Sequence, residues 1–260
     1  MTPANSTLLV AAAQIVSGPD PVANLATAIE SVRRAAAAGA QLVVLPEATM
    51  ACFGTDLGAV AEPLDGPWAS VLRQCAADLD VTVVAGMFEP ADDGRVHNTL
   101  LVAGRDVDTS YRKIHLYDAF GSRESDLVAP GDHHVVVTVR GVRVGLATCY
   151  DLRFADQFTA LGRAGAELVV VPASWGDGPG KSDQWDLLTR ARATDAQAWL
   201  LAADQAWVPP RGTDPLGVGR SVLVDALGRV RVMLGHEAAL LTTEIDLTFV
   251  QQVRERIPVL

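Results

Sequence analysis

Four residues of this chain carry side chains that could together perform acyl transfer: Glu47, Lys113, Glu124 and Cys149. A thiol is a weak nucleophile until it is deprotonated, and a carboxylate within hydrogen-bond reach can take its proton. We assign this role to Glu47. An ammonium group and a backbone N–H close to the nucleophile stabilise the oxyanion of a tetrahedral intermediate; Lys113 and the N–H of Tyr150 would supply them. Glu124 would orient Lys113 or position water for deacylation.

Cys149 lies where a buried strand is expected to turn into a helix. The preceding stretch, 142–147, is mainly apolar, and residues 154–163 have helical spacing. Asp151 can cap the element that follows. Such a turn presents a side chain to solvent and leaves backbone N–H groups free beside it. The alternative is that Cys149 is a small buried hydrophobic residue, as most free cysteines are.

The other three candidates also lie where a strand ends or in a loop. Glu47 follows the apolar run 42–46, so its carboxylate must find either water or a partner. Lys113 ends a strand-like segment, and Glu124 lies in the loop 121–132. Each of these positions, taken alone, is also compatible with an ordinary solvated residue. Together the four form a coherent set for acyl transfer.

The elements that must position these residues alternate between strands and helices, with hairpins inserted from Val96 onward. No internal repeat or low-complexity linker divides the chain, so we expect one domain spanning residues 1–260. Many strands are apolar on both faces, which suits mixed sheets packed on each other with helices outside. The predicted fold class is α/β, a four-layer αββα sandwich. The expected strands are 8–13, 41–45, 81–86, 98–103, 109–113, 135–139, 142–147, 168–172, 199–204, 221–225, one from 230, and 240–246. The expected helices are 21–38, 67–79, 154–163, about 182–195, and a short one at the C-terminal end.

The composition, with 49% hydrophobic and 20% charged residues, is typical of a soluble globular protein. The net charge of −10 argues against a nucleic-acid partner, because no basic run offers phosphates a binding surface. No stretch reaches the roughly 18 apolar residues of a membrane span. The first apolar run, 8–16, has no basic residue before it and is interrupted by Gln14, so we expect a strand rather than a signal peptide.

The five histidines and three cysteines show no metal-binding pattern. His133 and His134 are adjacent, and the remaining histidines form no ligand spacing. An odd number of cysteines at no disulfide spacing fits a reducing compartment, and we expect the protein in the cytoplasm.

Three segments closely resemble the signature segments of the nitrilase superfamily, the carbon–nitrogen hydrolases: PEATM at 46–50, YRKIHLYD at 111–118 and CYDLRF at 149–154. The spacing also agrees, with 66 residues from Glu47 to Lys113 and 36 from Lys113 to Cys149. Supporting matches cover nearly the whole chain, including the RESDLVAPGD loop, PASWG at 172–176, RARATDAQA at 190–198 and the closing EIDLTFVQQVRERIPVL. Three motifs at this spacing are specific, whereas any one alone is weak.

The resemblance implies the αββα sandwich of that family and no metal or organic cofactor. By position, it implies that Glu47 is the general base, Lys113 the oxyanion-stabilising lysine, Cys149 the nucleophile and Glu124 an additional active-site glutamate. Family members usually pair as dimers through the helix after the nucleophile and the C-terminal segment. We therefore expect a homodimer, with higher assembly open.

Within the superfamily, CYDLRF and the segment from KIHLYD to RES look most similar to the branch of ω-amidases and deaminated-glutathione amidases. This resemblance implies an amidase that cleaves a small amide, such as an α-keto acid ω-amide, through a Cys149 thioester and releases ammonia. Arg153 could meet the substrate's carboxylate, or form an ion pair with Asp151 or a nearby loop acid. Tyr150, Trp175 and Phe120 would line the pocket, although aromatic residues are also common in cores.

Some positions depart from the family pattern, and other functions stay open. Asp195-Ala196 stands where Glu and Asn are common, and Asp204 replaces a usual Asn. The Pro- and Gly-rich loop from Trp207 to Gly219 is expected over the pocket mouth. The alternatives are an N-carbamoyl amide or nitrile hydrolase of the same superfamily, or a non-catalytic regulatory homologue.

Overall fold

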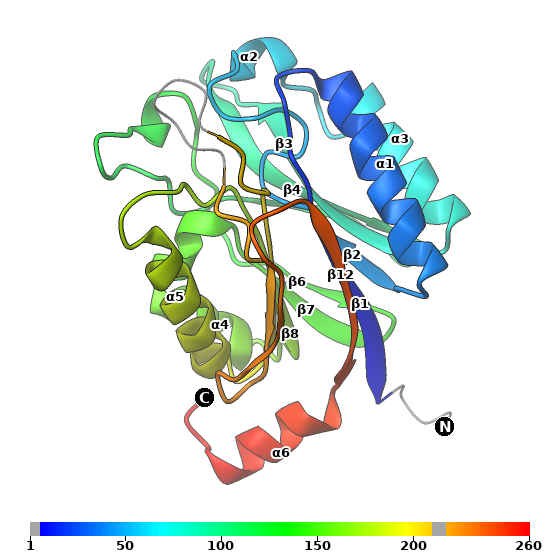
Figure 1. Cartoon of the computed structure of the whole chain (residues 1–260), viewed down its shortest axis with the longest axis vertical. Helices are drawn as coiled ribbons and strands as arrows, with labels where there is room; N and C mark the ends of the chain where they lie inside the picture. The colour runs from blue at the N-terminus through cyan, green and yellow to red at the C-terminus, as the bar shows by residue number, and fades with distance from the viewer. Residues whose placement is uncertain (1–5, 210–216) are drawn as a thin grey trace.

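The computed structural model describes residues 6–209 and 217–260, and these contain two six-stranded sheets packed face to face (Figure 1). The first sheet contains β1 (Thr7–Gln14), β2 (Leu42–Val44), β3 (Thr82–Pro90), β4 (Val96–Gly104), β5 (Val107–Arg112) and β12 (Ala239–Asp246). The second contains β6 (Val136–Val139), β7 (Val142–Leu146), β8 (Leu168–Ala173), β9 (Trp199–Asp204), β10 (Val222–Val224) and β11 (Val230–Met233). The helices are α1 (Pro21–Ala37), α2 (Leu57–Val60), α3 (Pro67–Asp78), α4 (Ala155–Arg163), α5 (Lys181–Ala196) and α6 (Thr248–Arg256).

Both sheets are mixed and have corresponding strand orders. The first runs β12-β1-β2-β3-β4-β5 and the second β11-β10-β9-β8-β7-β6. In each sheet three central strands are parallel, β1-β2-β3 and β7-β8-β9, and the outer pairs are antiparallel. The expected strands 135–139 and 142–147 form one of the predicted hairpins, since Val139 pairs with Val142.

The core of the described residues consists of three apolar layers and a smaller cluster around Phe88. The central layer joins the inner faces of the two sheets and includes Val44 and Leu146. α1 and α3 cover the outer face of the first sheet, while α4 and α5 cover that of the second through side chains such as Phe158 and Trp185 (Figure 1). Burial of each such large side chain contributes roughly 1.5–3 kcal/mol. This layering confirms the predicted αββα sandwich.

Helix α1 illustrates how the local sequence fixes an element. Asp20 caps its N-terminus by accepting the N–H of Val22, and Pro21 occupies the first turn, where a missing N–H costs nothing. Ala28, Val32 and Ala35 bury one face. The chain leaves the helix through Gly39, whose φ of 89° favours glycine.

The ends of parallel strands bring the candidate residues to one edge of the sandwich. Glu47 follows β2 and Cys149 follows β7, while Ser174 and Asp204 lie at the ends of β8 and β9. Since parallel strands place their carboxyl ends at the same edge of a sheet, these positions converge. The antiparallel strands β4 and β5 of the first sheet contribute further residues to the site: Asn98 lies on β4 and Lys113 follows β5.

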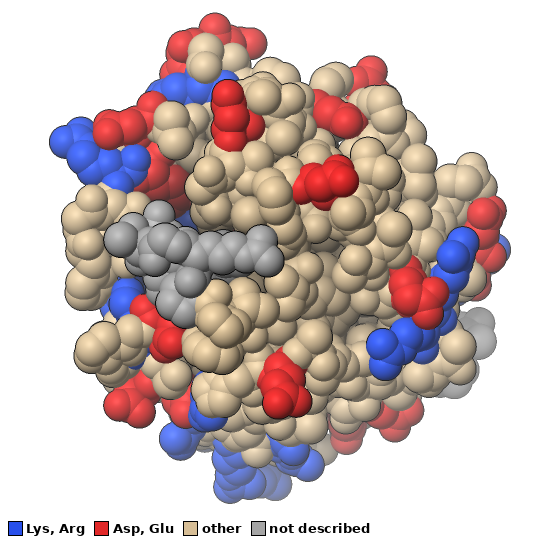
Figure 2. All heavy atoms as spheres, turned by 45° about the horizontal axis from the view of Figure 1, so that its top comes forward, with Lys and Arg blue, Asp and Glu red and all other residues tan. Residues whose placement is uncertain are grey.

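Some local features were not expected from the sequence: the short helix α2 and the 3-10 helices η1 (Glu124–Asp126) and η2 (Cys149–Arg153). No helix in the described ranges is long and apolar enough to cross a membrane. Figure 2 shows one face of the molecule, where acidic side chains are scattered and basic ones lie mainly toward the margin. Basic side chains gather at the lower margin of that view, and the centre of the face carries acidic ones.

Candidate active site

The turn after β7 holds Cys149 in a strained conformation. Its φ of 43° lies in the left-handed region that residues other than glycine rarely adopt. Strain of this kind persists only where the surrounding structure enforces it, and it is frequent at active sites. The predicted strand-to-helix turn is confirmed. The thiol is not presented to solvent as expected, however, because Cys149 is only 8% exposed.

The carboxylate of Asp151 stabilises this turn through hydrogen bonds. Its Oδ2 accepts hydrogen bonds from the Tyr111 hydroxyl at 2.6 Å and from the N–H of Thr148 at 2.8 Å. Its Oδ1 accepts the N–H of His115 at 3.2 Å and lies 2.8 Å from Nδ1 of the same residue. Asp151 therefore belongs to the capping box of η2, whose N-cap is Thr148, and does not cap α4, whose N-cap is Phe154.

Glu47 is carried on a tight turn that packs against β3. Ala48 next to it has a φ of 57°. A Cβ atom added at Gly86 would lie 2.6 Å from the Ala48 nitrogen and 2.8 Å from the Glu47 Cα, so only glycine permits this approach. Glu47 itself is 1% exposed.

Lys113 lies between the two predicted carboxylates. Its Nζ is 2.9 Å from Oε1 of Glu47, and 3.1 and 2.9 Å from Oε1 and Oε2 of Glu124. The N–H of Tyr117 also donates to Oε2 of Glu124 at 2.6 Å. The three side chains thus form one buried ion-pair chain in which Glu124 orients the ammonium group.

Asn98 on β4 belongs to the same cluster and was missed in the sequence. Its Nδ2 donates to Oε1 of Glu47 at 2.7 Å and to Oε1 of Glu124 at 3.1 Å. The available signal was a polar residue within the apolar stretch of β4, because a buried amide must find partners.

Ser174 connects the base to the nucleophile. Its backbone N–H donates to Oε2 of Glu47 at 2.9 Å and also hydrogen-bonds the sulfur of Cys149. This role could not be predicted from the sequence, because a backbone N–H carries no residue-type signal. Glu47 and Cys149 are thereby held against a common donor.

Burial and charge govern the protonation of this cluster. Burial raises the pKa of the Cys149 thiol well above its usual range, and the Glu47 carboxylate adds to this effect. The Lys113 ammonium and the Ser174 N–H oppose it only in part. Burial would lower the pKa of Lys113, but Glu124 and Glu47 outweigh it and hold the pKa well above the usual value. The site therefore combines a protonated thiol with a charged lysine.

Arg153 lies among the predicted pocket aromatics. Its guanidinium carbon is 5.1 Å from the ring centre of Trp175, 5.8 Å from that of Tyr150 and 6.0 Å from that of Phe120. Its Nη2 donates to Oε1 of Gln184 at 2.6 Å, while its Nε is buried without a described partner.

The predicted ion pair of Arg153 with Asp151 or a loop acid is wrong for the described part of the chain. Both Asp151 oxygens are already occupied, by Tyr111, Thr148 and His115. No described acid forms an ion pair with Arg153, whose described contacts are the Gln184 amide oxygen and aromatic rings.

Lys181, the first residue of α5, is a second cation that the sequence analysis missed. Its Nζ lies 4.0 Å from the ring centre of Phe120 and 3.2 Å from the hydroxyl of Tyr117. It forms no ion pair with any residue in the described ranges. A lysine at a helix N-terminus is electrostatically unfavourable, which was the only available signal.

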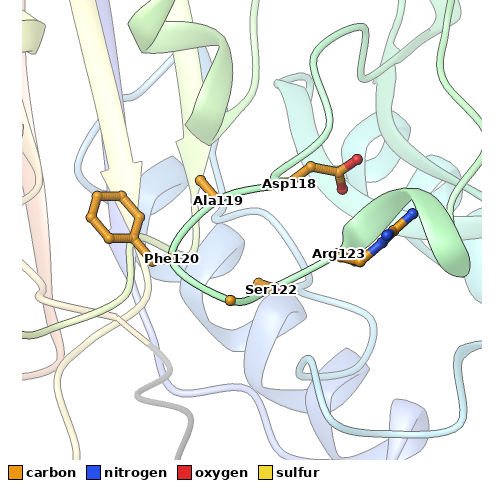
Figure 3. A pocket seen from close by; sticks show the side chains of 6 residues that line it. Asp118, Ala119, Phe120, Ser122 and Arg123 are labelled. Atoms are coloured by element: carbon orange, nitrogen blue, oxygen red, sulfur yellow. The ribbon is translucent and has the colours of Figure 1, made fainter.

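Phe120 lies on an exposed loop at the edge of this region and is itself 73% exposed. Residues 118–123 line a hollow of about 520 Å³, and the Phe120 ring points away from Asp118 and Arg123 (Figure 3). Cys149 does not line this hollow, so we assign the chemistry to the buried cluster instead.

Asp195 and the loop that begins at Trp207 were further departures from the family pattern. Asp195 pairs with Arg192 on the same helix. Trp207 donates from Nε1 to Oδ2 of Asp177 at 2.8 Å, but residues 210–216 of the predicted loop lie outside the described residues. Among the described residues, no group of three or more His, Cys, Asp or Glu could hold a metal ion.

Known proteins match this chain over nearly its full length. Residues 9–255 match the family model described as carbon-nitrogen hydrolase. "Hydrolase Rv0480c" of Mycobacterium tuberculosis is 52% identical, with 96% of this chain and 94% of that protein covered. "Omega-amidase NIT2-A" of Xenopus laevis is 32% identical (95% and 91% covered), and "Deaminated glutathione amidase" of Escherichia coli O157:H7 is 34% identical (97% and 96%).

Solved structures have the same fold. Saccharomyces cerevisiae Nit3, a member of branch 10 of the nitrilase superfamily, superposes with a TM-score of 0.86 at 26% identity, covering 98% of this chain and 95% of that one. A mutant amidase from Nesterenkonia sp. AN1 has a TM-score of 0.80 at 25% identity, with 99% and 98% covered. In that structure the active-site cysteine carries the acetamide moiety of fluoroacetamide.

Proposed function

Because this chain belongs to the carbon–nitrogen hydrolase family, we propose that it is an amidase that cleaves a small linear amide through an acyl-enzyme on Cys149. The family assignment makes it a hydrolase of C–N bonds and confirms the resemblance to the nitrilase superfamily. One observation carries the finer proposal. The buried ion-pair chain of Glu47, Lys113 and Glu124 meets Cys149 at the shared N–H of Ser174.

In the acylation step, Glu47 takes the proton of the Cys149 thiol as the sulfur attacks the amide carbonyl carbon. A protonated resting thiol fits this role, since a base must then accept the proton during attack. The oxyanion that forms is stabilised by the Lys113 ammonium and the N–H of Tyr150. When the C–N bond breaks, protonated Glu47 passes its proton to the leaving nitrogen, and ammonia departs.

In the deacylation step, Glu47 removes a proton from water, whose oxygen attacks the thioester carbonyl. Collapse of the second tetrahedral intermediate breaks the C–S bond, releases the carboxylic acid and returns the proton to Cys149. Glu124 keeps Lys113 in place through both steps, which the contacts of Lys113 Nζ with both Glu124 oxygens support.

For the substrate, we propose an amide with a carboxylate at its far end, such as an ω-amide of an α-keto acid. Arg153 and Lys181 provide two cations without described acidic partners beside Tyr150 and Trp175, and those residues directly follow Cys149 and Ser174. A guanidinium group binds a carboxylate through paired hydrogen bonds. Two of the relatives bear the names omega-amidase and deaminated glutathione amidase, which supports an amide as the substrate.

The proposed reaction is tested by ammonia release from α-keto acid ω-amides and from plain aliphatic amides. Cys149→Ala, Glu47→Gln and Lys113→Ala should each abolish release. Cys75→Ala, a change of a half-buried cysteine on α3, should leave it intact. Intact-mass spectrometry should detect the trapped acyl group on the wild-type protein and none on Cys149→Ala. An active Cys149→Ala protein would refute the proposal, and carbon dioxide released alongside ammonia would mark an N-carbamoyl hydrolase instead.

The substrate class has its own test. Arg153→Met and Lys181→Met should each lower kcat/KM for the acidic amide about 10- to 100-fold, the size of a lost charge-assisted hydrogen bond. Turnover of a neutral aliphatic amide should change little. Equal losses on both substrates would argue against carboxylate recognition by these cations.

We further propose that two copies pair through α4 and the C-terminal segment. The segment beyond α6 exposes apolar side chains, with Ile257 44% and Val259 63% exposed, and Leu260 reaches Gly162 of α4. Light scattering should give the mass of a dimer, and Val259→Asp should shift it to that of a monomer.

A further inference from the structure

Gln205 is a buried glutamine that connects the two sheets beside Glu47. It directly follows β9 of the second sheet and is 2% exposed. Its Nε2 donates to the carbonyl of Glu47 at 3.0 Å and to Oγ of Ser17 at 2.8 Å, and its Oε1 accepts the N–H of Ser17 at 3.0 Å. Ser17 and Glu47 follow β1 and β2 of the first sheet. One side chain of the second sheet therefore binds residues of the first at two positions.

The backbone of Gln205 is connected to Glu47 by a second route. Its N–H donates to the carbonyl of Ala173 at 3.1 Å. That carbonyl belongs to the same peptide group as the N–H of Ser174, which donates to Oε2 of Glu47 at 2.9 Å and hydrogen-bonds the sulfur of Cys149. Hydrogen bonds in such a chain polarise and strengthen one another. Gln205 thus holds the main chain of Glu47 with its side chain, and the peptide that binds the Glu47 carboxylate with its N–H.

The surroundings leave the side-chain amide of Gln205 little freedom to move. A Cβ atom added at Gly217 would lie 2.7 Å from the Cβ of Gln205, so the backbone is closely packed on this side. On the other side, the Ser17 hydroxyl donates to the carbonyl of Thr49 at 3.3 Å, and Thr49 lies two residues after Glu47. The amide is therefore fixed between the two sheets.

We infer that Gln205 is a positioning residue of the active site: its side-chain amide sets the position of the Glu47 main chain, so that the carboxylate meets the Ser174 N–H and the Cys149 thiol. This inference rests on the proposed function, in which Glu47 removes the thiol proton. Loss of the amide leaves the Glu47 carbonyl and the Ser17 N–H without a buried partner, and the turn shifts to satisfy them. A displacement of about 1 Å is enough to cost much of the rate.

Gln205→Met keeps the length of the side chain and removes its donors and its acceptor. The kcat for amide hydrolysis, per folded molecule, should fall about tenfold or more, because the base no longer lies in place against the sulfur. KM should change little, since Gln205 contacts none of the groups that we propose to bind the substrate.

A second measurement follows the separation of Glu47 and Cys149 without turnover. A carboxylate beside a thiol disfavours the thiolate, so its displacement lowers the pH at which the thiolate forms. The pH midpoint for alkylation of Cys149 by iodoacetamide, located by peptide mass mapping, should therefore be lower in Gln205→Met and lower still in Glu47→Gln. Adding Gln205→Met to Glu47→Gln should cause no further shift, because no carboxylate is left to displace.

Gln14→Met is the matched control. Gln14 is also a buried glutamine, at the end of β1, and is 1% exposed. Its Nε2 donates to the carbonyls of Gly235 and Glu237, and its Oε1 accepts the N–H of Ser221 at 2.8 Å. The residue type, the burial and the number of side-chain hydrogen bonds match those of Gln205, but none of these bonds reaches the turn that carries the base. Gln14→Met should lose stability to urea as Gln205→Met does, and should leave kcat per folded molecule and the alkylation midpoint unchanged.

The outcomes separate positioning from mere structural support. A lower kcat together with a lower midpoint in Gln205→Met, neither of them seen in Gln14→Met, supports the inference. It is overturned by an unchanged midpoint, by an unchanged kcat, or by an equal further shift in the Glu47→Gln background. If Gln205→Met does not fold, Gln205→Asn, which keeps a polar amide on a side chain one methylene shorter, decides by the same two measurements. A wild-type protein that hydrolyses no amide would refute the proposed function, and the alkylation midpoints would still decide whether Gln205 positions Glu47.

Discussion

The Nζ atom of Lys113 lies 2.9 Å from Oε1 of Glu47, although 66 residues separate them and both side chains are at most 2% exposed. Removing two charges from water costs several kcal/mol per ion, and their attraction compensates this only when the remaining donors and acceptors are satisfied. Glu124 and Asn98 meet that need here. The site is therefore held together by the groups that we propose to react.

Lys113→Met should unfold far more easily than the wild type, because it leaves two carboxylates buried without a cation. Losing one partner of a buried pair typically costs about 3–5 kcal/mol, which urea denaturation would measure. Lys181→Met removes a lysine that pairs with no described acid, and its stability should change by less than about 1 kcal/mol. Equal stabilities of the two variants would contradict a structural role for the ion-pair chain.

Asn98→Asp should inactivate the protein. It replaces a donor at 2.7 Å from Glu47 and 3.1 Å from Glu124 with a third carboxylate, so that like charges meet in a buried site. Its stability should recover partly as pH falls and a carboxylate is protonated. Asn24→Asp, at a buried amide that donates to the carbonyls of Gly18 and Met50, is the control. It should lose stability but keep its rate per folded molecule.

Gly86→Ala should displace Glu47. The added methyl group would lie 2.6–2.8 Å from the backbone of residues 46–48, where neither strand nor turn can yield easily. We expect a strong loss of ammonia release with secondary structure retained in circular dichroism. Gly58→Ala meets only Asp56 Oδ1 at 3.5 Å and should leave activity unchanged. A fully active Gly86→Ala protein would show that the turn tolerates movement.

The raised pKa of Cys149 predicts a loss of stability at alkaline pH. Above about pH 8.5 the unfolded chain releases its thiol proton first, because the folded protein retains it to higher pH. This contribution to stability is fully present below the unfolded pKa and is lost as pH rises toward the folded one. The unfolding free energy of the wild type should therefore fall more steeply with pH than that of Cys149→Ala. Parallel curves would mean that folding does not shift the pKa of the Cys149 thiol.

Sequence reasoning worked for features that depend on local order. Apolar runs, Pro21 and Gly39 marked elements whose bounds agree with the structure to within a few residues. The motifs also placed Glu47 and Cys149 directly after strands. Strand ends that must converge in such a sheet are predictable, because the chain direction of each strand follows from its connections.

The sequence by itself thus determined the αββα layers, the family and the four residues of the ion-pair and thiol cluster. Only the tertiary structure decided how deeply Cys149 is buried, that Arg153 lies against aromatics instead of Asp151, and that Asn98 and Ser174 join the cluster. The physical reason is distance along the chain. Asn98 and Ser174 reach Glu47 across 51 and 127 residues, so their contacts depend on the register and packing of two sheets. No local pattern of residue types encodes that register.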